Sequence, residues 1–515
     1  MPLDLFRPGG LTAALLPDLV LATGAMLLLL YAAIRPASAE HQRRVGIGSA
    51  VLLALTLGVV GYVATRGYTA AGGPIAVDNF RWAADAVLLV GALLTVLTAV
   101  EYQDRERITA PESHVLVLLA TSGMLLLVAA RDLTLVFLGI ELMSIAVYAL
   151  VALNRRSARS AEGALKYFLL GAFSTAFLLY GMALVYGATG STSFAGIAAA
   201  LGDEVALGSP LLKAGLALLV VGFGFKVAAA PFHMWAPDAY EGAPTPYTGF
   251  MAATVKAAAF VAFLRLFVEA FPAAVAQWHF AVWWLAAITM VLGNVTALAQ
   301  RNLKRMLAYS SIAHAGYLLV AVVVGVGSGP ATGITGSGAL LFYLFAYTLA
   351  TMGAFAVLSA LGTAGEGGQD VEDYSGLWSV RPGLTLAMSV FMLALLGFPV
   401  FGGIGFFAKW YMLQAALRGG AAPQTRLAVI LVITSVLSAG YYLYVVSVMF
   451  MRPRLEGAPV PARVGGLTGA VITVTVALIL VFGFAPTQVL RAMNRSALSS
   501  VIAVPPPPTA VVRTP

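Results

Sequence analysis

The chain has 515 residues, of which 60% are hydrophobic and only 10% are charged, and its formal net charge is +8. A soluble domain carries about 45–50% apolar and about 25% charged residues, so this composition excludes a soluble multidomain protein and a disordered one. The chain contains no cysteine, which excludes thiolate-held iron–sulfur clusters, cysteine zinc sites and disulfides within it. Taken alone, the basic excess indicates nucleic acid or an anionic membrane surface as a partner.

Apolar runs long enough to cross a bilayer recur along the whole chain. A hydrocarbon core of about 30 Å needs about 20 apolar residues per helix. The runs are continuous rather than alternating with period two, which excludes a membrane barrel. The sequence therefore predicts an all-α polytopic membrane protein of about fourteen transmembrane helices. In chain order, the predicted spans are 12–34, 45–65, 84–100 (a short one), 114–130, 133–153, 162–187, 211–230, 246–268, 280–298, 305–326, 337–361, 384–417, 426–450 and 466–490.

The ends and the loops of the chain indicate its orientation. The first apolar run is too long for the core of a cleaved signal peptide, so we expect a retained first helix. The four prolines at 505–508 predict a loose, non-helical tail. Loop arginines and lysines are more frequent after odd-numbered spans, and positively charged loops usually stay in the cytoplasm. Both termini are therefore predicted on the outer side.

Charged residues inside the predicted spans are few and of selected types. A charge at mid-bilayer costs about 2.5–3.5 kcal/mol and marks a functional site by default. Of the 22 acidic residues, only Glu141 lies near a span centre, whereas Lys226, Lys256 and Lys409 lie deep in apolar surroundings. The chain has 24 arginines and six lysines, yet lysine occupies these deep positions, and a desolvated lysine can lose its proton where arginine cannot. The alternative for each residue is an ion pair that locks two helices.

Other polar residues are weaker candidates for function. His314 is a candidate proton carrier, the alternative being a hydrogen-bonded packing histidine. Lys166 lies about one turn inside the sixth span. Asp18 and Asp85 lie near span ends and are expected to reach the interface, and Arg265 is expected to snorkel to it.

The seventh and twelfth predicted spans are interrupted beside their lysines. The stretch 230–237, with two prolines, follows Lys226, and the glycine-rich stretch 397–405 precedes Lys409. Broken membrane helices occur where protein or a water-lined cavity surrounds them, and they mark ion sites in transporters. Because the breaks lie five spans apart, equivalent helices would cross in opposite directions, which predicts an inverted repeat of spans 4–8 and 9–13. The predicted domains are a three-helix segment (1–110), the two five-helix repeats (111–270 and 271–455), and a last helix with the tail (456–515).

One long motif resembles a known family. The stretch 231–246, PFHMWAPDAYEGAPTP, resembles the signature of the antiporter-like membrane subunits of respiratory complex I, and its YEGAPTP version is similar to the subunit N branch in bacteria. Supporting stretches are GIELMS at 139–144, LKYFLLGA at 165–172 and NLKRMLAYSS at 302–311. Two sister subunits fit less well. The distal one is usually longer, and the middle one usually has Glu where this chain has Lys409.

The resemblance implies a proton-transfer role for the deep polar residues. These are Glu141, Lys226, Lys256 and Lys409, with His314 and Lys166 as further members. Glu141 would pair with Lys226. Lys256 would relay protons toward the second half of the chain, and Lys409 would connect to the opposite side of the membrane.

The function implied by the resemblance is that of a proton-translocating membrane-arm subunit of NADH:quinone oxidoreductase, which couples quinone reduction to proton transfer along a buried Glu/Lys axis. It implies a bacterial plasma (inner) membrane location, with the other membrane-arm subunits and the lipid bilayer as partners and no nucleic acid. We expect no cofactor or metal in this chain, and FMN, iron–sulfur clusters and quinone in partner subunits. The alternatives are a subunit of a multisubunit cation/proton antiporter, which shares the fold, and a structural scaffold in which the buried charges are dispensable.

Overall fold

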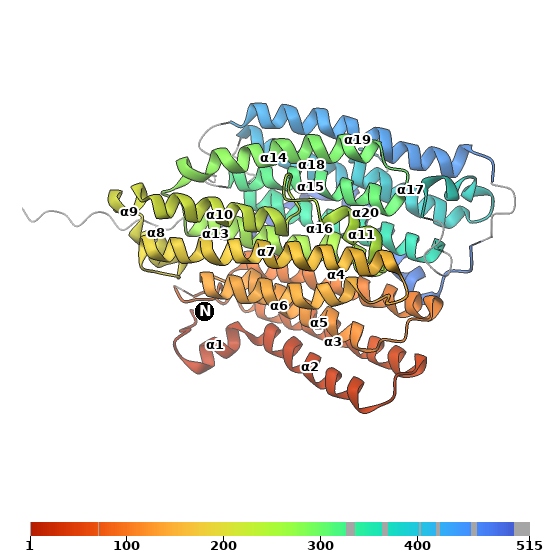
Figure 1. Cartoon of the computed structure of the whole chain (residues 1–515), viewed down its shortest axis with the longest axis horizontal. Helices are drawn as coiled ribbons and strands as arrows, with labels where there is room; N and C mark the ends of the chain where they lie inside the picture. The colour runs from red at the N-terminus through yellow and green to blue at the C-terminus, as the bar shows by residue number, and fades with distance from the viewer. Residues whose placement is uncertain are drawn as a thin grey trace, which may run out of the picture.

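The computed structural model describes residues 2–70, 72–325, 335–362, 369–400, 403–418, 423–454 and 461–498, and its regular structure in these ranges is helical apart from isolated bridges. Within them, twelve helices are long and apolar enough to cross a membrane. Figure 1 shows these helices lying roughly parallel to one another. The chain is an all-α, multi-pass membrane protein.

The twelve long helices match twelve of the predicted spans. They are α2 (Leu16–Ile34), α3 (Ala39–Thr65), α4 (Asn79–Glu106), α5 (Glu112–Ala129), α6 (Leu133–Val151), α7 (Ala158–Thr189), the segment Thr245–Glu269 formed by α12 (Thr245–Phe250), η1 (Met251–Val255) and α13 (Lys256–Glu269), α14 (Val275–Leu298), α15 (Leu303–Val324), α16 (Gly336–Leu361), α19 (Thr425–Met451) and α20 (Gly466–Phe484). The third span was predicted to be short, but α4 is one of the longest helices.

The two spans predicted to be broken consist of shorter helices. The seventh is formed by α10 (Pro210–Lys226), and α11 (Ala236–Gly242) follows its break. The twelfth is formed by α17 (Pro382–Leu396) and α18 (Ile404–Arg418). Residues 401 and 402 of the second break, and the prolines at 505–508, lie outside the described residues. The predicted total of fourteen spans requires that α10 with α11 counts as one crossing of the membrane and that α17 with α18 counts as another. This total stays a prediction.

Short helices connect or flank the long ones. They are α1 (Pro8–Ala14), α8 (Phe194–Ala200), α9 (Glu204–Gly208), η3 (Val371–Tyr374), η4 (Leu377–Ser379) and α21 (Pro486–Arg495). Acidic side chains at helix starts fix several boundaries, since Asp78 and Asp132 accept backbone N–H groups at the starts of α4 and α6. Glu101 of α4 caps the distant α20 in the same way, because its carboxylate accepts from the N–H groups of Leu467 and Thr468 at 2.9 Å each.

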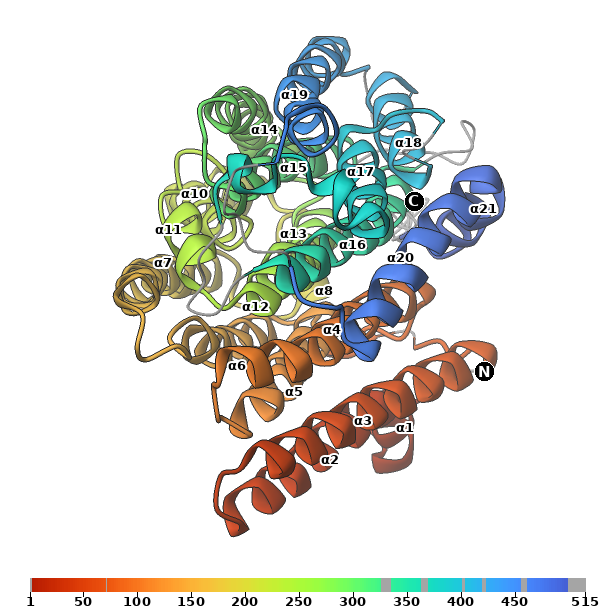
Figure 2. The same ribbon diagram turned by 90° about the vertical axis from the view of Figure 1, so that its right-hand side faces the viewer.

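The helices form a central group and a periphery. Figure 2 looks along the bundle, with α12, α13 and α16 near its middle, α2 and α3 as the outermost layer on one side, and α14 and α19 on the opposite side. Nearly all residues of α15, α16 and the Thr245–Glu269 segment are buried, whereas most of α2, α7, α19 and α20 is not. The outer helices are apolar, so their exposed faces suit lipid, and the central helices α13 and α15 hold Lys256 and His314.

Close glycine contacts join the first two helices of each predicted repeat. A Cβ atom on Gly123 of α5 would lie 2.5 Å from the backbone nitrogen of Met143 in α6. On α14, a Cβ atom on Gly293 would lie 2.5 Å from the backbone nitrogen of Ala313 in α15. Matching contacts at the starts of the two five-helix units support the inverted repeat, whose domain limits stay a prediction.

Candidate proton-transfer site

The five polar residues of the predicted axis lie on five different helices. Lys226 is the last residue of α10, Lys256 the first of α13, and Lys409 lies in α18, while Glu141 and His314 lie in α6 and α15. The three lysines and the histidine are at most 7% exposed. In the described part of the chain, each lysine ammonium group has only neutral oxygen partners.

Lys226 and Glu141 are neighbours but not in direct contact. The Lys226 Nζ donates to Ser144 Oγ at 2.9 Å, and Glu141 Oε1 accepts from Thr175 Oγ1 at 2.9 Å. Ser144 lies three residues after Glu141, and residues so spaced share a helix face, so the ammonium group lies about one turn from the carboxylate. Among the described residues no ion pair within 4.0 Å joins the two. Ser144 therefore occupies the place that the resemblance gave to Glu141.

The break after Lys226 has its backbone groups satisfied by side chains. Ala228 has a φ of +56°, which costs an L-residue about 1–2 kcal/mol, and such strain is common at functional sites. The carbonyl oxygen of Phe225 accepts from the indole N–H of Trp235 at 3.1 Å, and the N–H of Ala230 donates to Thr289 Oγ1 at 3.0 Å. Irregular backbone can persist at membrane depth when protein groups satisfy it in this way.

Lys256 follows the π-helical turn η1. A π turn inserts an extra residue into a helix and is frequent at functional sites. The Lys256 Nζ donates to the carbonyl oxygen of Ser311 at 2.8 Å and to its hydroxyl at 2.5 Å. The nearby hydroxyl of Thr254, which lies in the π turn, has no hydrogen-bond partner among the described residues. The turn thus sets the direction in which Lys256 points, toward α15.

His314 is hydrogen-bonded at both ring nitrogens. Its Nδ1 lies 2.7 Å from the hydroxyl of Tyr343 and its Nε2 lies 3.2 Å from that of Tyr442. The Tyr442 hydroxyl is also hydrogen-bonded to Ser310. His314 lies three residues after Ser311, the partner of Lys256, so the two share a face of α15. A ring with hydroxyls on both nitrogens can accept a proton on one side and donate on the other.

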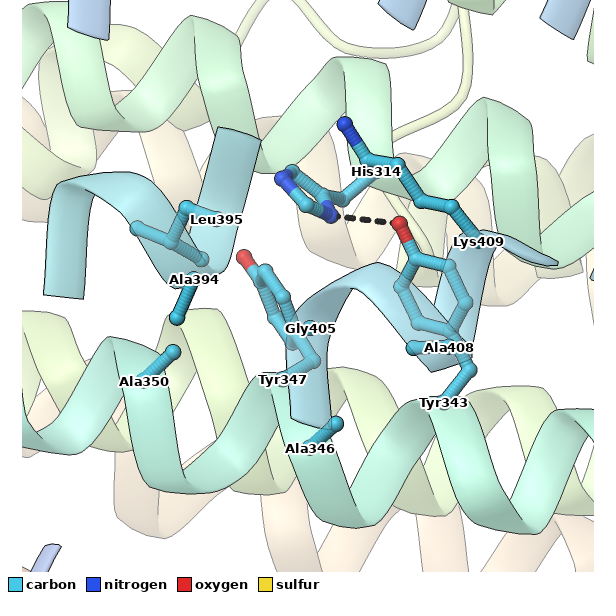
Figure 3. A pocket seen from close by; sticks show the side chains of 10 residues that line it. All are labelled: His314, Tyr343, Ala346, Tyr347, Ala350, Ala394, Leu395, Gly405, Ala408 and Lys409. Carbon is cyan, nitrogen blue, oxygen red and sulfur yellow. Dashed lines mark hydrogen bonds between the residues drawn. The ribbon is translucent and has the colours of Figure 1, made fainter. Parts of the chain in front are cut away.

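Lys409 lies across a small cavity from this histidine. The cavity measures about 10 Å³ and is lined by His314, Tyr343, Tyr347 and Lys409, among others, and Figure 3 shows the lysine reaching over the imidazole ring. The volume of this cavity is close to what one water molecule needs. The Lys409 Nζ donates to the carbonyl oxygen of Leu396 at 2.8 Å and to Ser435 Oγ at 2.9 Å.

These contacts form a row from Lys256 to Lys409 but not a continuous one from Lys226. No hydrogen bond in the described residues joins the Lys226–Ser144 pair to the Lys256–Ser311 pair. The structure therefore brings together Lys256, His314 and Lys409, and it keeps Glu141 and Lys226 as a separate group.

Lys166 belongs to a charged cluster at the end of the bundle where α7 and α15 begin. Its Nζ lies 2.7 Å from Glu162 and 2.7 Å from Asp238, and Arg305 Nη1 donates to Asp238 at 2.8 Å and to Glu241 at 2.9 Å. Burial alone would raise the pKa of Asp238, but its hydrogen bonds to Lys166 and Arg305 lower it below its ordinary value. This cluster lies on the predicted inner side of the membrane.

Arg265 corrects one prediction. It does not snorkel to the interface, because it is fully buried and pairs with Asp78 at 2.7 Å and with Glu269 at 2.9 Å. Arg131 joins the same two carboxylates. Burial alone would raise the pKa of Asp78, but the charge and hydrogen bonds of Arg265, with the charge of Arg131, lower it. The partner Asp78 lies 187 residues away in the chain, so hydropathy could not reveal the pair.

The hydroxyl partners of the axis were also missed by sequence reasoning. Ser144, Ser311, Tyr343 and Tyr442 hold the lysines and the histidine, but serine and tyrosine within apolar helices are too common to stand out. The only available signal was spacing, since Ser144 and Ser311 each lie three residues from Glu141 or His314. Among the described residues, no group of three His, Cys, Asp or Glu side chains could hold a metal ion.

Comparison with known proteins identifies the family. Residues 130–438 match the family model described as NADH:quinone oxidoreductase/Mrp antiporter, TM. NADH-quinone oxidoreductase subunit N of Gemmatimonas aurantiaca is 52% identical over 503 residues, which cover 96% of this chain and 95% of the relative. The chain belongs to the NADH-quinone oxidoreductase subunit N family. This membership confirms the resemblance carried by the motif at 231–246.

Solved structures of this family and of related complexes share the fold. A chain of respiratory complex I from Thermus thermophilus with bound aureothin is 38% identical, with a TM-score of 0.75 over 93% of this chain and 100% of that chain. A chain of the Mrp complex from Dietzia sp. DQ12-45-1b matches with a TM-score of 0.79 at 20% identity, over 94% of this chain and 96% of that chain. The second likeness concerns the fold alone. All six candidate residues lie within the family segment 130–438.

Proposed function

We propose that this chain is the proton-translocating membrane-arm subunit of NADH:quinone oxidoreductase, and that its buried Glu/Lys axis moves protons while partner subunits reduce quinone. The observation that carries the proposal is the set of three buried lysines with neutral partners, two of them beside broken helices. A charged side chain inside a membrane has a high free-energy cost, and such residues usually have a function. The family membership and the complex I chain of similar fold support the same reading.

The first step is a movement of the Lys226 ammonium group between two partners on α6. Bound to Ser144 it has a neutral partner, and one turn away it would meet the Glu141 carboxylate. An ionised carboxylate next to the ammonium group favours the protonated lysine, and a neutral hydroxyl does so much less. The backbone break that follows Lys226 provides the freedom for this movement. Lys226 therefore holds its proton beside Glu141 and releases it beside Ser144.

The second step passes the proton along the centre of the bundle. Lys256 receives it through water, since no hydrogen bond between described residues spans the gap from Lys226. Ser311 and the His314 ring then connect Lys256 to the small cavity, and one water molecule there would bridge to Lys409. Because these groups lie in low dielectric, a charge on one of them is felt strongly by the next. Against a membrane potential, each proton moved costs about 2.3 kcal/mol per 100 mV.

Entry and exit follow from the orientation predicted by the loop charges. The cluster of Lys166, Asp238 and Arg305 lies on the inner side and would supply protons from the cytoplasm. Both termini would lie on the outer, periplasmic side of the bacterial inner membrane. FMN, iron–sulfur clusters and quinone would lie in partner subunits, so this chain contributes proton transfer to the enzyme and not electron transfer.

The second candidate function is that of a subunit of a multisubunit cation/proton antiporter. It is favoured by one observation, the fold shared with a chain of the Mrp complex. A sodium-driven pH response in vesicles that hold the complex and receive no NADH would support it.

The test replaces Lys226 in the assembled complex. Lys226→Ala should leave assembly and NADH oxidation by the redox subunits measurable while reducing proton pumping into vesicles at least several-fold. Lys213→Ala is the matched control, because Lys213 is exposed at the start of α10, on the same helix. If Lys226→Ala pumps as well as the control, the buried charges are dispensable and the scaffold interpretation holds.

A further inference from the structure

A second buried charge cluster lies outside the axis, in the N-terminal three-helix segment. Arg81 of α4 is fully buried, and its Nη2 donates to Asp18 Oδ2 of α2 at 2.5 Å. Its Nε lies 3.4 Å from Asp85 Oδ2, one turn along the same helix. Its Nη1 donates to the carbonyl oxygens of Ala14 at 3.1 Å and Ala76 at 3.0 Å. One guanidinium group therefore faces two carboxyl groups.

The carboxyl group of Asp85 is buried without a hydrogen-bond donor. The residue is fully buried, and neither of its oxygens has a hydrogen-bond partner among the described residues; nor does Asp18 Oδ1. An ionised carboxylate in this position would have lost its water without gaining donors, which is strongly unfavourable. Asp18 differs, because 15% of its side chain is exposed.

Charge counting shows a deficit of one positive charge within this cluster and the adjoining cluster of Arg265. The other charged groups that act on Asp85 are Arg265 and Asp78. Asp78 and Glu269 are both held by arginines, since Arg265 and Arg131 donate to each of them. The four carboxyl groups of the two adjoining clusters thus face three guanidinium groups. The unbalanced acid is one of the pair that shares Arg81.

We propose that Asp18 and Asp85 form a proton-binding site in which the two carboxyl groups share one proton beside Arg81. Two carboxyl groups that depend on one buried guanidinium group cannot both be ionised in low dielectric, so one acid stays neutral. A metal cation is a poor alternative occupant, because the carbonyl oxygens of Ala14 and Ala76 already accept from Arg81 and, among the described residues, no third acid joins the pair to hold a metal. The site lies where α2 and α4 begin, on the side of the membrane predicted to be outer, and it stands apart from the Lys226–Lys409 axis.

The test uses infrared spectra of the purified, assembled complex made with 13C-labelled aspartate. The wild type should show the C=O band of a neutral carboxylic acid, shifted by the label and by D₂O. Both Asp85→Asn and Asp18→Asn should lose that component, because each leaves Arg81 with a single carboxylate that no longer needs a proton. Asp104→Asn is the control, since Asp104 is exposed on the same helix α4. A band of equal intensity in the wild type and both variants would overturn the proposal. So would a band that changes when sodium chloride replaces choline chloride.

Thermal melting of the same samples separates a shared proton from an ordinary ion pair. Each single variant should melt close to the wild type, because one acid remains to pair with Arg81. The double variant, Asp18→Asn with Asp85→Asn, should melt well below either single variant, since it leaves the buried guanidinium unpaired. If Asp85→Asn alone melts as low as the double variant, Asp85 is an ionised partner of Arg81 and the shared proton is refuted.

Discussion

Replacement of Lys409 by Glu tests whether its site needs only a titratable group or specifically a donor. The Lys409 ammonium group donates to the carbonyl oxygen of Leu396, the last residue of α17. The final carbonyls of a helix lack internal partners and carry partial negative charge. Lys409 therefore stabilises the end of α17 at the break. A carboxylate at this position would place two hydrogen-bond acceptors, its own oxygen and the carbonyl oxygen of Leu396, next to each other without a donor.

The contacts of Lys409 set the expected loss of stability in Lys409→Glu. Loss of a hydrogen bond from a charged group costs about 1.5–3 kcal/mol. Exchange of a cation for an anion near a helix C-terminus removes about 0.3–1 kcal/mol and adds a repulsion of similar size. Ser435 can turn its hydroxyl to donate, so its contact is kept. Lys409→Glu should therefore destabilise the subunit by about 2–5 kcal/mol. Lys409→Gln, which keeps an N–H donor, should cost less than half of that.

The assay compares thermal melting and NADH-driven proton pumping of the assembled complex. The expected order of stability is wild type, Lys409→Gln, then Lys409→Glu. Both variants should pump poorly. Gln does not titrate. An ionised Glu is repelled by the carbonyl oxygen of Leu396, and a protonated Glu keeps its proton in a hydrogen bond to that oxygen. Lys213→Glu makes the same chemical change at an exposed position and should behave as the wild type. If Lys409→Glu has the melting temperature and pumping rate of this control, the contact with Leu396 contributes neither to stability nor to proton transfer.

Two further changes probe the middle of the proposed proton path and its entry. Tyr442→Phe removes the hydroxyl on Nε2 of His314 and should lower pumping several-fold with assembly unchanged, measured in vesicles; full activity would show that this hydroxyl carries no protons. Asp238→Asn should lower the melting temperature at neutral pH, because Lys166 and Arg305 lower the pKa of Asp238 below its ordinary value of 3.8. A lowered folded-state pKa stabilises above the unfolded value and is lost as pH falls through the folded one, so the gap between wild type and variant should shrink below about pH 4. A gap independent of pH would mean that the carboxylate charge plays no part.

The lysines and the helix breaks could be predicted from the sequence because each is conspicuous against its background. A charge within an apolar run stands out on a hydropathy scan, and so does a pair of prolines such as those that follow Lys226. The partners of these lysines could not be predicted in the same way. Ser144 lies 82 residues from Lys226, and only the packing of α6 against its neighbours selects it from many other serines.

The failed expectations for Arg265 and for the third span have the same physical origin. Arg265 lies late in its span, where a snorkelling side chain is the usual outcome, but it pairs instead with the partly exposed carboxylate of Asp78, which comes from a distant part of the chain. The short third span was judged by its apolar run alone. The helix α4 continues to Glu106 because a helix can extend beyond the hydrocarbon once its polar residues reach protein or water. A hydropathy scan shows how many residues of a helix are apolar enough for the hydrocarbon core, and it does not show where the helix ends.

The neutral partners of the lysines bear on the direction of proton transfer. A lysine fixed in a buried ion pair keeps its proton, since deprotonation would strand the carboxylate. Among the described residues, Lys256 and Lys409 face hydroxyl and carbonyl oxygens only, so each can gain or lose a proton without leaving a buried counter-charge behind. Glu141, one turn from the partner of Lys226, is the only carboxylate on the axis. In the proposed mechanism, the group that switches between holding and releasing a proton would therefore lie at the Lys226 end, and Lys256, His314 and Lys409 would relay the proton. On this proposal the contact between Lys226 of α10 and Ser144 of α6 would control transfer, and a change confined to Glu141 should alter when protons move without closing the path from Lys256 to Lys409.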